Sequence, residues 1–196
     1  MQHNNNLSLK LEDYIVVVED VLPHSLCDDI LKEYADSNEW NQGKLNVDNK
    51  VVINKDRRNC NTIFISDSKT IYKNFSVRKK IDKQIFESVG KACSIYSKKF
   101  KNFRILKDEG YELLKYEKNG FFEEHVDSYS YAHRILSCSL ILNDNFEGGE
   151  FSFFNEKIIH SLKKGSAILF PSNFMYPHSI LPVKSGIRYS IVTWLV

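Results

Sequence analysis

Two histidines and one aspartate in the second half of the chain have the types and spacing of metal ligands. His125 and Asp127 stand two residues apart in FFEEHVDSYS. On a strand, side chains at positions i and i+2 point to the same side, so this imidazole and this carboxylate can reach one point. Taken alone, a His-x-Asp pair more often marks a structural histidine beside a surface acid. His178, which follows 178 − 125 = 53 residues later in NFMYPHSILP, changes that interpretation.

The three side chains together match one kind of metal chemistry. Two neutral imidazoles and one carboxylate on one face of an ion form the facial triad that selects non-haem Fe(II) and leaves positions open for oxygen and a co-substrate. Zinc hydrolases also use two histidines and one acid, but the sequence lacks their helical HExxH spacing. We therefore predict that His125, Asp127 and His178 form a metal-binding catalytic centre.

A fourth residue adds an anion-binding group. Arg188 follows His178 by 188 − 178 = 10 residues and begins the apolar run RYSIVTWLV. A guanidinium that points into an apolar interior needs an anion, because a buried unpaired charge is very unfavourable. Its planar fork suits a carboxylate held at two points. The same alternation turns Ser190 inward as a further hydroxyl donor; the alternative is that Arg188 pairs with a structural Asp or Glu.

Short strands in the second half are expected to position these residues. Runs rich in β-branched and aromatic residues are separated there by turn signals such as Asn-Gly, Gly-Gly and Lys-Gly. Strands at such close spacing indicate a sandwich or a jelly-roll barrel. The expected strands cover residues 111–116, 134–143, 150–154, 166–170 and 188–196.

The first half is expected to support that barrel from outside. A short apolar run predicts a strand over 13–20, and apolar residues at helical spacing predict a helix over 26–40. A longer amphipathic helix with a lysine-rich face is predicted over 77–100. We therefore expect an α+β, mainly β fold in a single domain, 1–196, with a helical support over about 1–103 and a barrel core over about 104–196.

Composition limits the class of protein. Of 196 residues, 42% are hydrophobic and 13% aromatic, which excludes a disordered chain. With 27 Lys and Arg against 25 Asp and Glu, the formal charge of +2 disfavours a nucleic-acid partner bound mainly through phosphates. Four dispersed cysteines suit neither a zinc site nor a disulfide scaffold and indicate a reducing compartment. Without an apolar run long enough to span a membrane, the sequence predicts a cytoplasmic protein with no membrane partner.

The motifs together resemble those of the Fe(II)/2-oxoglutarate-dependent dioxygenases, in their prolyl 4-hydroxylase-like branch. The stretch YELLKYEKNGFFEEHVD is similar to that branch's strand with an inward Tyr, a Gly turn and HxD. RILSCSLILNDNFEGGEFSFF resembles its Arg…Leu-Asn…Gly-Gly-Glu stretch, and KKGSAILFPSNFMYPHSILPVKSGIRYSIVTWLV resembles its Gly…Phe-Pro…His…Arg…Trp ending. The resemblance implies a double-stranded β-helix, a jelly-roll or cupin-like barrel, with N-terminal supporting helices.

The resemblance also implies roles for single residues. His125, Asp127 and His178 would bind Fe(II), and Arg188 would bind the distal carboxylate of 2-oxoglutarate. Tyr116, nine residues before the first histidine, matches a strand tyrosine whose hydroxyl contacts the same co-substrate. A core aromatic residue with a peripheral hydroxyl is the alternative for Tyr116.

The chain departs from the family at Ile141, where many members have a second tyrosine that contacts the co-substrate. Ser190 or another group would replace that contact. On the substrate side, Arg134 matches a family arginine near the entrance of the site. Tyr129 and Tyr131 lie in the loop just after the first two ligands, and we expect them to contact substrate or to cover the mouth of the barrel.

The function implied by the resemblance is a 2-oxoglutarate- and O2-dependent hydroxylase that produces succinate and CO2. Its expected substrate is a prolyl residue of a peptide or protein, and ascorbate is a further expected cofactor. Two alternatives stay open: a dioxygenase acting on a free amino acid or small metabolite, and a non-catalytic, metal-stabilised binding or sensing module. A nucleic-acid demethylase is disfavoured, because Trp194 stands where that branch has a second arginine.

Overall fold

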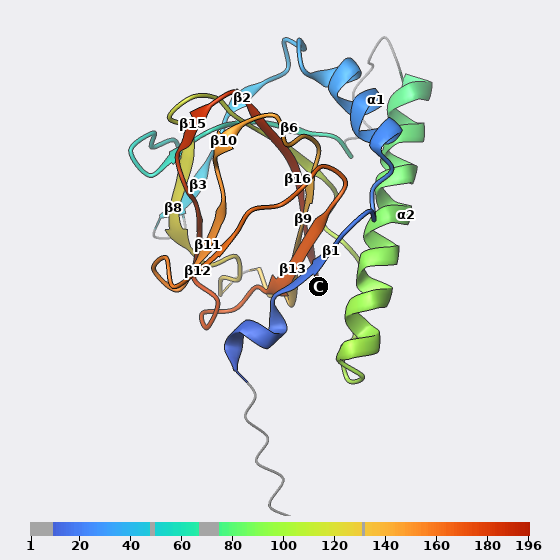
Figure 1. The fold of residues 1–196 in the computed structure, drawn as a ribbon, viewed down its shortest axis with the longest axis vertical. Helices are drawn as coiled ribbons and strands as arrows, with labels where there is room; N and C mark the ends of the chain where they lie inside the picture. Colours follow the sequence, from blue (N-terminus) through green and yellow to red (C-terminus); the bar gives the residue numbers. More distant parts are fainter. Residues whose placement is uncertain (1–9, 48–49, 67–74, 131) are drawn as a thin grey trace, which may run out of the picture.

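Two antiparallel β-sheets form the body of the fold, and two helices cover one of them (Figure 1). The computed structural model describes residues 10–47, 50–66, 75–130 and 132–196. In this described part, the larger sheet has seven strands, in the spatial order β1 (Val16–Val18), β13 (Ala167–Pro171), β9 (Leu136–Ile141), β16 (Arg188–Leu195), β7 (Glu112–Tyr116), β6 (Asn61–Phe64) and β2 (Asn41–Gln42).

The second sheet faces the larger one across the interior of the fold (Figure 1). Its five described strands lie in the order β12 (Ile158–His160), β11 (Phe151–Phe153), β14 (His178–Ile180), β8 (Phe121–His125) and β5 (Arg58–Asn59). Two smaller pairs accompany these sheets, namely β3 (Leu45–Val47) with β4 (Lys50–Val52), and β10 (Glu147–Gly148) with β15 (Val183–Ser185).

The long helix α2 (Phe75–Lys99) packs on the outer face of the larger sheet, as its sequence pattern predicted (Figure 1). Its buried positions recur every three or four residues, and its lysines point to solvent. Helix α1 (His24–Tyr34) is shorter than the predicted 26–40. It ends early because the indole nitrogen of Trp40 donates hydrogen bonds to the carbonyl oxygens of Tyr34 and Ala35, at 2.9 and 3.2 Å.

The strand predicted over 13–20 is also shorter than expected. A 3-10 turn, η1 (Leu11–Tyr14), occupies the beginning of that run, and only β1 pairs with the sheet. The carboxylate of Asp13 accepts a hydrogen bond from the backbone N–H of Lys10 at 2.9 Å, which closes the turn. The apolar run therefore divides between a turn and a three-residue strand.

The two faces of the larger sheet have different chemistry. On β9, Leu136, Cys138 and Leu140 are buried against the helices, whereas the alternate residues Ser137 and Ser139 face the interior between the sheets. Strand β16 shows the same alternation, with Arg188 and Ser190 on the interior side. The helix side thus forms a continuous apolar core, and the interior side carries polar groups that can do chemistry.

The first half of the chain contributes more than the helical support expected over about 1–103. Strands β1, β2 and β6 belong to the larger sheet, and β5 belongs to the smaller one. The division of a single domain into support and barrel core stays a prediction. No helix in the described ranges is long and apolar enough to cross a membrane.

Candidate metal centre and anion site

The pairing of β8 with β14 brings the three predicted metal ligands together. In this antiparallel pair His178, the first residue of β14, lies opposite His125, the last residue of β8. Asp127 follows two residues later, and its backbone N–H donates to the carbonyl oxygen of Ser172 at 3.2 Å. One ligand atom from each of the three residues lies within 4.8 Å of the other two. Residues 53 positions apart in sequence (178 − 125 = 53) therefore form one cluster.

Backbone carbonyl groups orient both imidazoles. The Nδ1 atom of His125 lies 2.8 Å from the carbonyl oxygen of Glu123, and Nδ1 of His178 lies 3.1 Å from that of Tyr176. When each Nδ1–H donates to its carbonyl, the lone pair is on Nε2. The two Nε2 atoms lie 3.6 and 3.5 Å from the carboxylate oxygens of Asp127. Metal-binding histidines are oriented in this way, so the cluster fits a divalent metal ion.

Burial and hydrogen bonding set the charge states of the cluster. Burial alone would raise the pKa of Asp127, but His178, His125 and the hydroxyl of Ser137 hold that pKa well below its usual range. Ser137 donates to the Asp127 carboxylate at 2.6 Å, and the Ser172 hydroxyl lies 2.8 Å from Ser137. Burial, assisted by His125, lowers the pKa of His178 to about 4. At neutral pH the cluster therefore offers neutral His178 and ionised Asp127, the forms that bind metals.

Arg188 enters the same interior from the first position of β16. Only 2% of its surface is exposed, and burial lowers the pKa of its guanidinium. Its Nη1 atom donates to the Ser190 hydroxyl at 2.7 Å, and its guanidinium lies over the rings of Tyr116 and Phe151, 5.2 and 5.4 Å from their centroids. Within the described residues the guanidinium forms no ion pair with an Asp or Glu. This buried cation therefore still needs an anion.

A cavity of about 50 Å³ is lined by the metal-ligand cluster and by Arg188 together. Tyr116 and Ser190, the other two predicted co-substrate residues, also line it. Both are buried, with exposed fractions of 1% and 0%. The structure thus brings all the predicted metal-ligating and co-substrate residues to one place between the two sheets.

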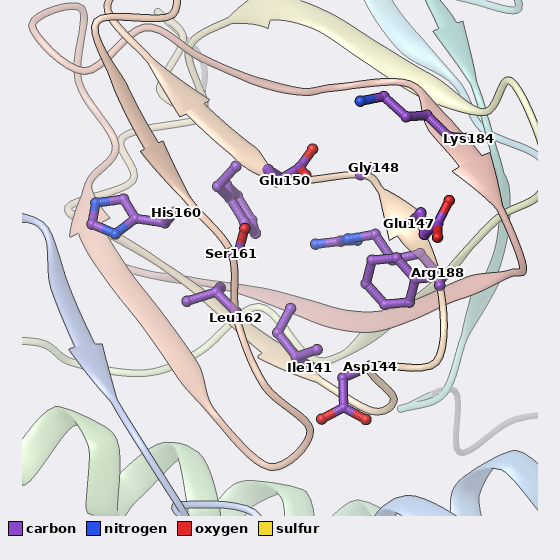
Figure 2. A pocket seen from close by; sticks show the side chains of 13 residues that line it. Ile141, Asp144, Glu147, Gly148, Glu150, His160, Ser161, Leu162, Lys184 and Arg188 are labelled. Carbon is purple, nitrogen blue, oxygen red and sulfur yellow. The ribbon is translucent and has the colours of Figure 1, made fainter.

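A second cavity, of about 400 Å³, also has Arg188 in its wall. Figure 2 shows the Arg188 side chain reaching from its strand toward the middle of this cavity, near Glu147. Ile141, where the family has a tyrosine in many members, lines this larger cavity and lies opposite Ser190 in the β9–β16 pair. The departure from the family pattern is therefore next to the anion site.

Arg134, predicted to lie on the substrate side, lies close to the metal-ligand cluster. Its Nη1 atom donates to the backbone carbonyl oxygen of Asp127 at 3.1 Å, and its Nε donates to Glu109 at 2.8 Å. The guanidinium carbon lies 3.6 Å from the ring centroid of Trp194, which lines the smaller cavity. Arg134 therefore connects the segment that carries Asp127 to the wall of the site.

Of the two loop tyrosines predicted to contact substrate, only Tyr129 lies in the described part of the chain. Tyr129 is half-buried, and its backbone forms an isolated antiparallel bridge with Ala132 just after the metal-ligand segment. Tyr131 lies outside the described residues. Tyr129 is not among the described residues that line the smaller cavity, and the predicted substrate role of both tyrosines stays a prediction.

Several residues of the site were missed by the sequence analysis. Ser137 and Ser139 carried a signal, since polar residues at alternate positions of an apolar strand mark an interior polar face. Arg58 carried none. Its guanidinium lies 4.7 Å from the ring centroid of Phe122, whose ring stacks on His125 at 3.6 Å between centroids. Only the pairing of β5 with β8 places Arg58 there.

Comparison with known proteins gives a family for the second half and a fold for nearly the whole chain. Residues 111–196 match the model of the 2OG-Fe(II) oxygenase superfamily. No curated protein matches the sequence significantly. Among solved structures, a prolyl hydroxylase from Trichoplax adhaerens, in complex with a hypoxia-inducible factor oxygen degradation domain peptide, is 19% identical with a TM-score of 0.74, and the alignment covers 93% of this chain and 83% of that one.

Two further solved structures share the fold. The viral collagen prolyl hydroxylase of Paramecium bursaria Chlorella virus-1, in its 2OG complex, is 17% identical with a TM-score of 0.66, and the alignment covers 93% of this chain and 95% of that one. A Pseudomonas putida prolyl-4-hydroxylase is 17% identical with a TM-score of 0.67, at 93% and 91% coverage. The predicted resemblance and the predicted double-stranded β-helix fold are therefore confirmed.

Proposed function

Because residues 111–196 match the model of the 2OG-Fe(II) oxygenase superfamily, we propose that the chain is a hydroxylase that acts on a prolyl residue of a peptide or protein. One observation carries this proposal. Arg188, a buried cation with no acidic partner in the described part of the chain, shares a small cavity with His125, Asp127 and His178. A metal-binding cluster beside an anion-binding group suits a co-substrate with a chelating end and a free carboxylate, as 2-oxoglutarate has.

The three ligand residues would hold Fe(II) through the two Nε2 atoms and the Asp127 carboxylate. When bound, Fe(II) and 2-oxoglutarate supply the activation of O2, which couples decarboxylation to succinate and CO2 with hydroxylation of the substrate. The protein keeps the ligands in their metal-binding forms. Ser137 donates to the Asp127 carboxylate, and the carbonyl oxygens of Glu123 and Tyr176 accept from the Nδ1–H groups.

The opposite side of the cavity would bind the distal carboxylate of 2-oxoglutarate. Arg188 offers its remaining N–H donors, because Ser190 accepts from one Nη1–H and fixes the orientation of the guanidinium. The Tyr116 ring lies beside the guanidinium, and burial raises the pKa of its phenol, so the hydroxyl stays protonated and can donate. Arg188, Ser190 and Tyr116 would together form a carboxylate-binding clamp. Because these residues are buried, charge-assisted hydrogen bonds to the carboxylate would be strong there.

The prolyl substrate is supported by the proteins that share the fold. The T. adhaerens structure is a prolyl hydroxylase in complex with a peptide, and the viral one is named a collagen prolyl hydroxylase. On the substrate side of this chain, Arg134 and Trp194 form a cation–aromatic pair next to the Asp127 segment. We propose that this pair, with Tyr129 and Tyr131, contacts the substrate.

Anaerobic addition of Fe(II) and 2-oxoglutarate to the purified protein tests the metal and co-substrate sites. We expect the visible charge-transfer band of the chelate, and succinate production once air is admitted. The control His178→Ala should lose both signals while its far-UV circular dichroism stays unchanged. If the wild-type protein shows neither the band nor succinate, the proposed function is wrong.

A second experiment tests the substrate class. Proline-containing peptides incubated with the loaded enzyme should gain one oxygen atom by mass spectrometry, and matched peptides with alanine in place of proline should not. Succinate production that responds only to free amino acids or small metabolites would favour the alternative dioxygenase. A chelate band with no turnover of any compound would favour the binding or sensing module. Use of ascorbate and a cytoplasmic location stay predictions.

A further inference from the structure

Three serine hydroxyls form a row on the interior face of the larger sheet. Ser137 and Ser139 are alternate residues of β9, and Ser190 lies on the neighbouring strand β16, opposite Ile141. All three line the cavity that holds the metal-ligand cluster and Arg188. Since alternate residues of a strand are about 7 Å apart, the row extends from the metal end of the cavity to the anion end.

The two ends of this row have protein partners. Ser137 donates to the carboxylate of Asp127 at 2.6 Å, and Ser190 accepts from Nη1 of Arg188 at 2.7 Å. Each hydroxyl therefore supports one functional group of the site. Their hydrogen bonds account for why polar residues are buried on this face.

Ser139, in the middle of the row, is different. It is 3% exposed, and its Oγ atom is buried without a hydrogen-bond partner among the residues that the structure describes. Its neighbours across the strands are apolar, Val192 on β16 and Ile168 on β13. A buried hydroxyl without a partner destabilises a fold, because its lost hydrogen bonds to water are not replaced. Such an exception inside a functional cavity calls for a partner that is not part of the chain.

We propose that the Ser139 hydroxyl donates a hydrogen bond to an oxygen of the 2-oxo dicarboxylate that lies between the metal ligands and Arg188. This inference rests on the proposed function and adds a co-substrate-binding residue to it. The ligand has acceptor oxygens at both ends and on its keto group, so a donor along its path is satisfied when it is bound. Ser139 therefore contributes to co-substrate affinity, and its hydroxyl is left unpaired only in the empty protein.

The substitution Ser139→Ala tests this contact. We expect the dissociation constant for N-oxalylglycine, a non-reactive dicarboxylate analogue of 2-oxoglutarate, to rise about tenfold, as expected for a lost hydrogen bond to a charged acceptor. The measurement is isothermal titration calorimetry of the Mn(II)-loaded protein with N-oxalylglycine. Without ligand, Ser139→Ala should unfold at the same or a higher temperature than the wild type, because the removed hydroxyl has no partner in the fold.

Thr193→Val is the matched control. The Thr193 hydroxyl is also buried without a partner, but it lies on the same sheet at a position that faces the helices. This variant should keep the wild-type affinity for N-oxalylglycine. Loss of affinity in Ser139→Ala but not in Thr193→Val would support the inference.

Three outcomes would overturn the inference. If the wild-type protein binds N-oxalylglycine and Ser139→Ala binds it equally well, the inference alone is wrong. If Ser139→Ala unfolds at a clearly lower temperature than Thr193→Val, the hydroxyl has a structural partner and the inference is again wrong. If the Mn(II)-loaded wild-type protein does not bind N-oxalylglycine, the proposed function is wrong, and the proposed Ser139 contact is wrong with it.

Discussion

The guanidinium carbon of Arg134 lies over the ring of Trp194, 3.6 Å from its centroid, and Nη1 of the same guanidinium donates to the backbone carbonyl oxygen of Asp127. Trp194 belongs to β16, the strand that carries Arg188. The guanidinium of Arg134 thus connects the segment of the metal ligand to the strand of the anion site. A cation–aromatic contact of this kind contributes about 0.5–2 kcal/mol, and a planar guanidinium can also stack on the ring, which a lysine ammonium cannot.

Replacing Arg134 by Ala or Lys should lower kcat/KM about 10- to 100-fold, because the Asp127 segment loses the group that fixes its carbonyl. Lys should not restore activity, since it lacks the planar surface that lies on Trp194. Succinate production under saturating 2-oxoglutarate measures the effect. Glu109→Gln removes only the partly exposed ion pair of Arg134 and should stay close to wild type. A fully active Arg134→Ala enzyme would contradict this role.

Ser137→Ala should weaken Fe(II) binding about 10- to 100-fold, because the carboxylate of Asp127 loses a buried hydrogen bond of 2.6 Å. Anaerobic titration of the apo-protein with Fe(II) gives the affinity directly. Ser172→Ala is the control. The Ser172 hydroxyl contacts the Ser137 hydroxyl rather than the Asp127 carboxylate, so this variant should lose less Fe(II) affinity than Ser137→Ala. Equal metal affinities in the wild type and Ser137→Ala would show that the hydrogen bond does not tune the ligand.

Arg188→Met should raise the KM for 2-oxoglutarate about 100-fold while Fe(II) affinity is kept, because the distal carboxylate loses its charged partner. In the absence of co-substrate, the same variant should unfold at a higher temperature, since a buried cation without an acidic partner is removed. Arg188→Lys keeps the positive charge but loses the planar guanidinium that can hold a carboxylate at two points. Its KM for 2-oxoglutarate should lie between those of the wild type and Arg188→Met. An unchanged 2-oxoglutarate requirement in Arg188→Met would refute the clamp.

Gly149→Ala should displace the side chain of Arg188, although Gly149 does not belong to β16, the strand that carries Arg188. Gly149 has φ +69°, and a Cβ there would meet Cδ of Arg188 at 2.9 Å and Cγ2 of Val183 at 3.0 Å. We expect a loss of about 1–3 kcal/mol in the free energy of unfolding and a higher KM for 2-oxoglutarate.

Gly90→Ala is the control for that substitution. Gly90 lies in α2, and a Cβ added there would meet no atom of the described residues within 4 Å outside its own helix backbone, so alanine there should stabilise the fold by about 0.5–1 kcal/mol without changing the KM. Chemical unfolding and succinate assays of both variants give the comparison. A Gly149→Ala protein as stable and as active as Gly90→Ala would be inconsistent with the crowding at Arg188.

Mn(II) should raise the unfolding temperature of the wild-type protein in a concentration-dependent way, since a ligand that binds only the folded state stabilises it by mass action. His178→Ala removes one of the three ligands and should show little or no such shift. His160→Ala is a matched control, because this histidine lies outside the cluster and should leave the shift intact. A similar metal-dependent shift in His178→Ala would place the metal elsewhere.

The sequence predicted which side chains meet in the interior better than it predicted the strands around them. His125, Asp127, His178 and Arg188 were found from side-chain chemistry and spacing, which do not depend on exact strand ends. The long helix α2 was predicted within two residues at each end, because many turns of periodic apolar residues define it. The roles of these site residues remain to be tested by the variants above.

The missed parts of the fold depend on contacts between distant segments. Strands β12, β14 and β15 have three residues each, too few to show a period of two. Arg58 reaches the cavity because β5 pairs with β8, where Arg58 lies opposite Phe122, 122 − 58 = 64 residues later in the chain, and no local pattern indicates this pairing. Ser137 and Ser139 could have been found, since hydroxyls at alternate positions of an apolar strand are unusual.

The alternation along β9 and β16 has an evolutionary consequence. Residues that pack toward the helices and residues that face the cavity occupy neighbouring positions on these strands, and their side chains point to opposite faces of the sheet. Point mutations at the cavity positions can therefore alter the preference for co-substrate or substrate while the adjacent apolar residues preserve the fold. Ser139 and Ile141, which line the two cavities, are two positions where a single substitution could change the chemistry of the site without changing the apolar side of the sheet.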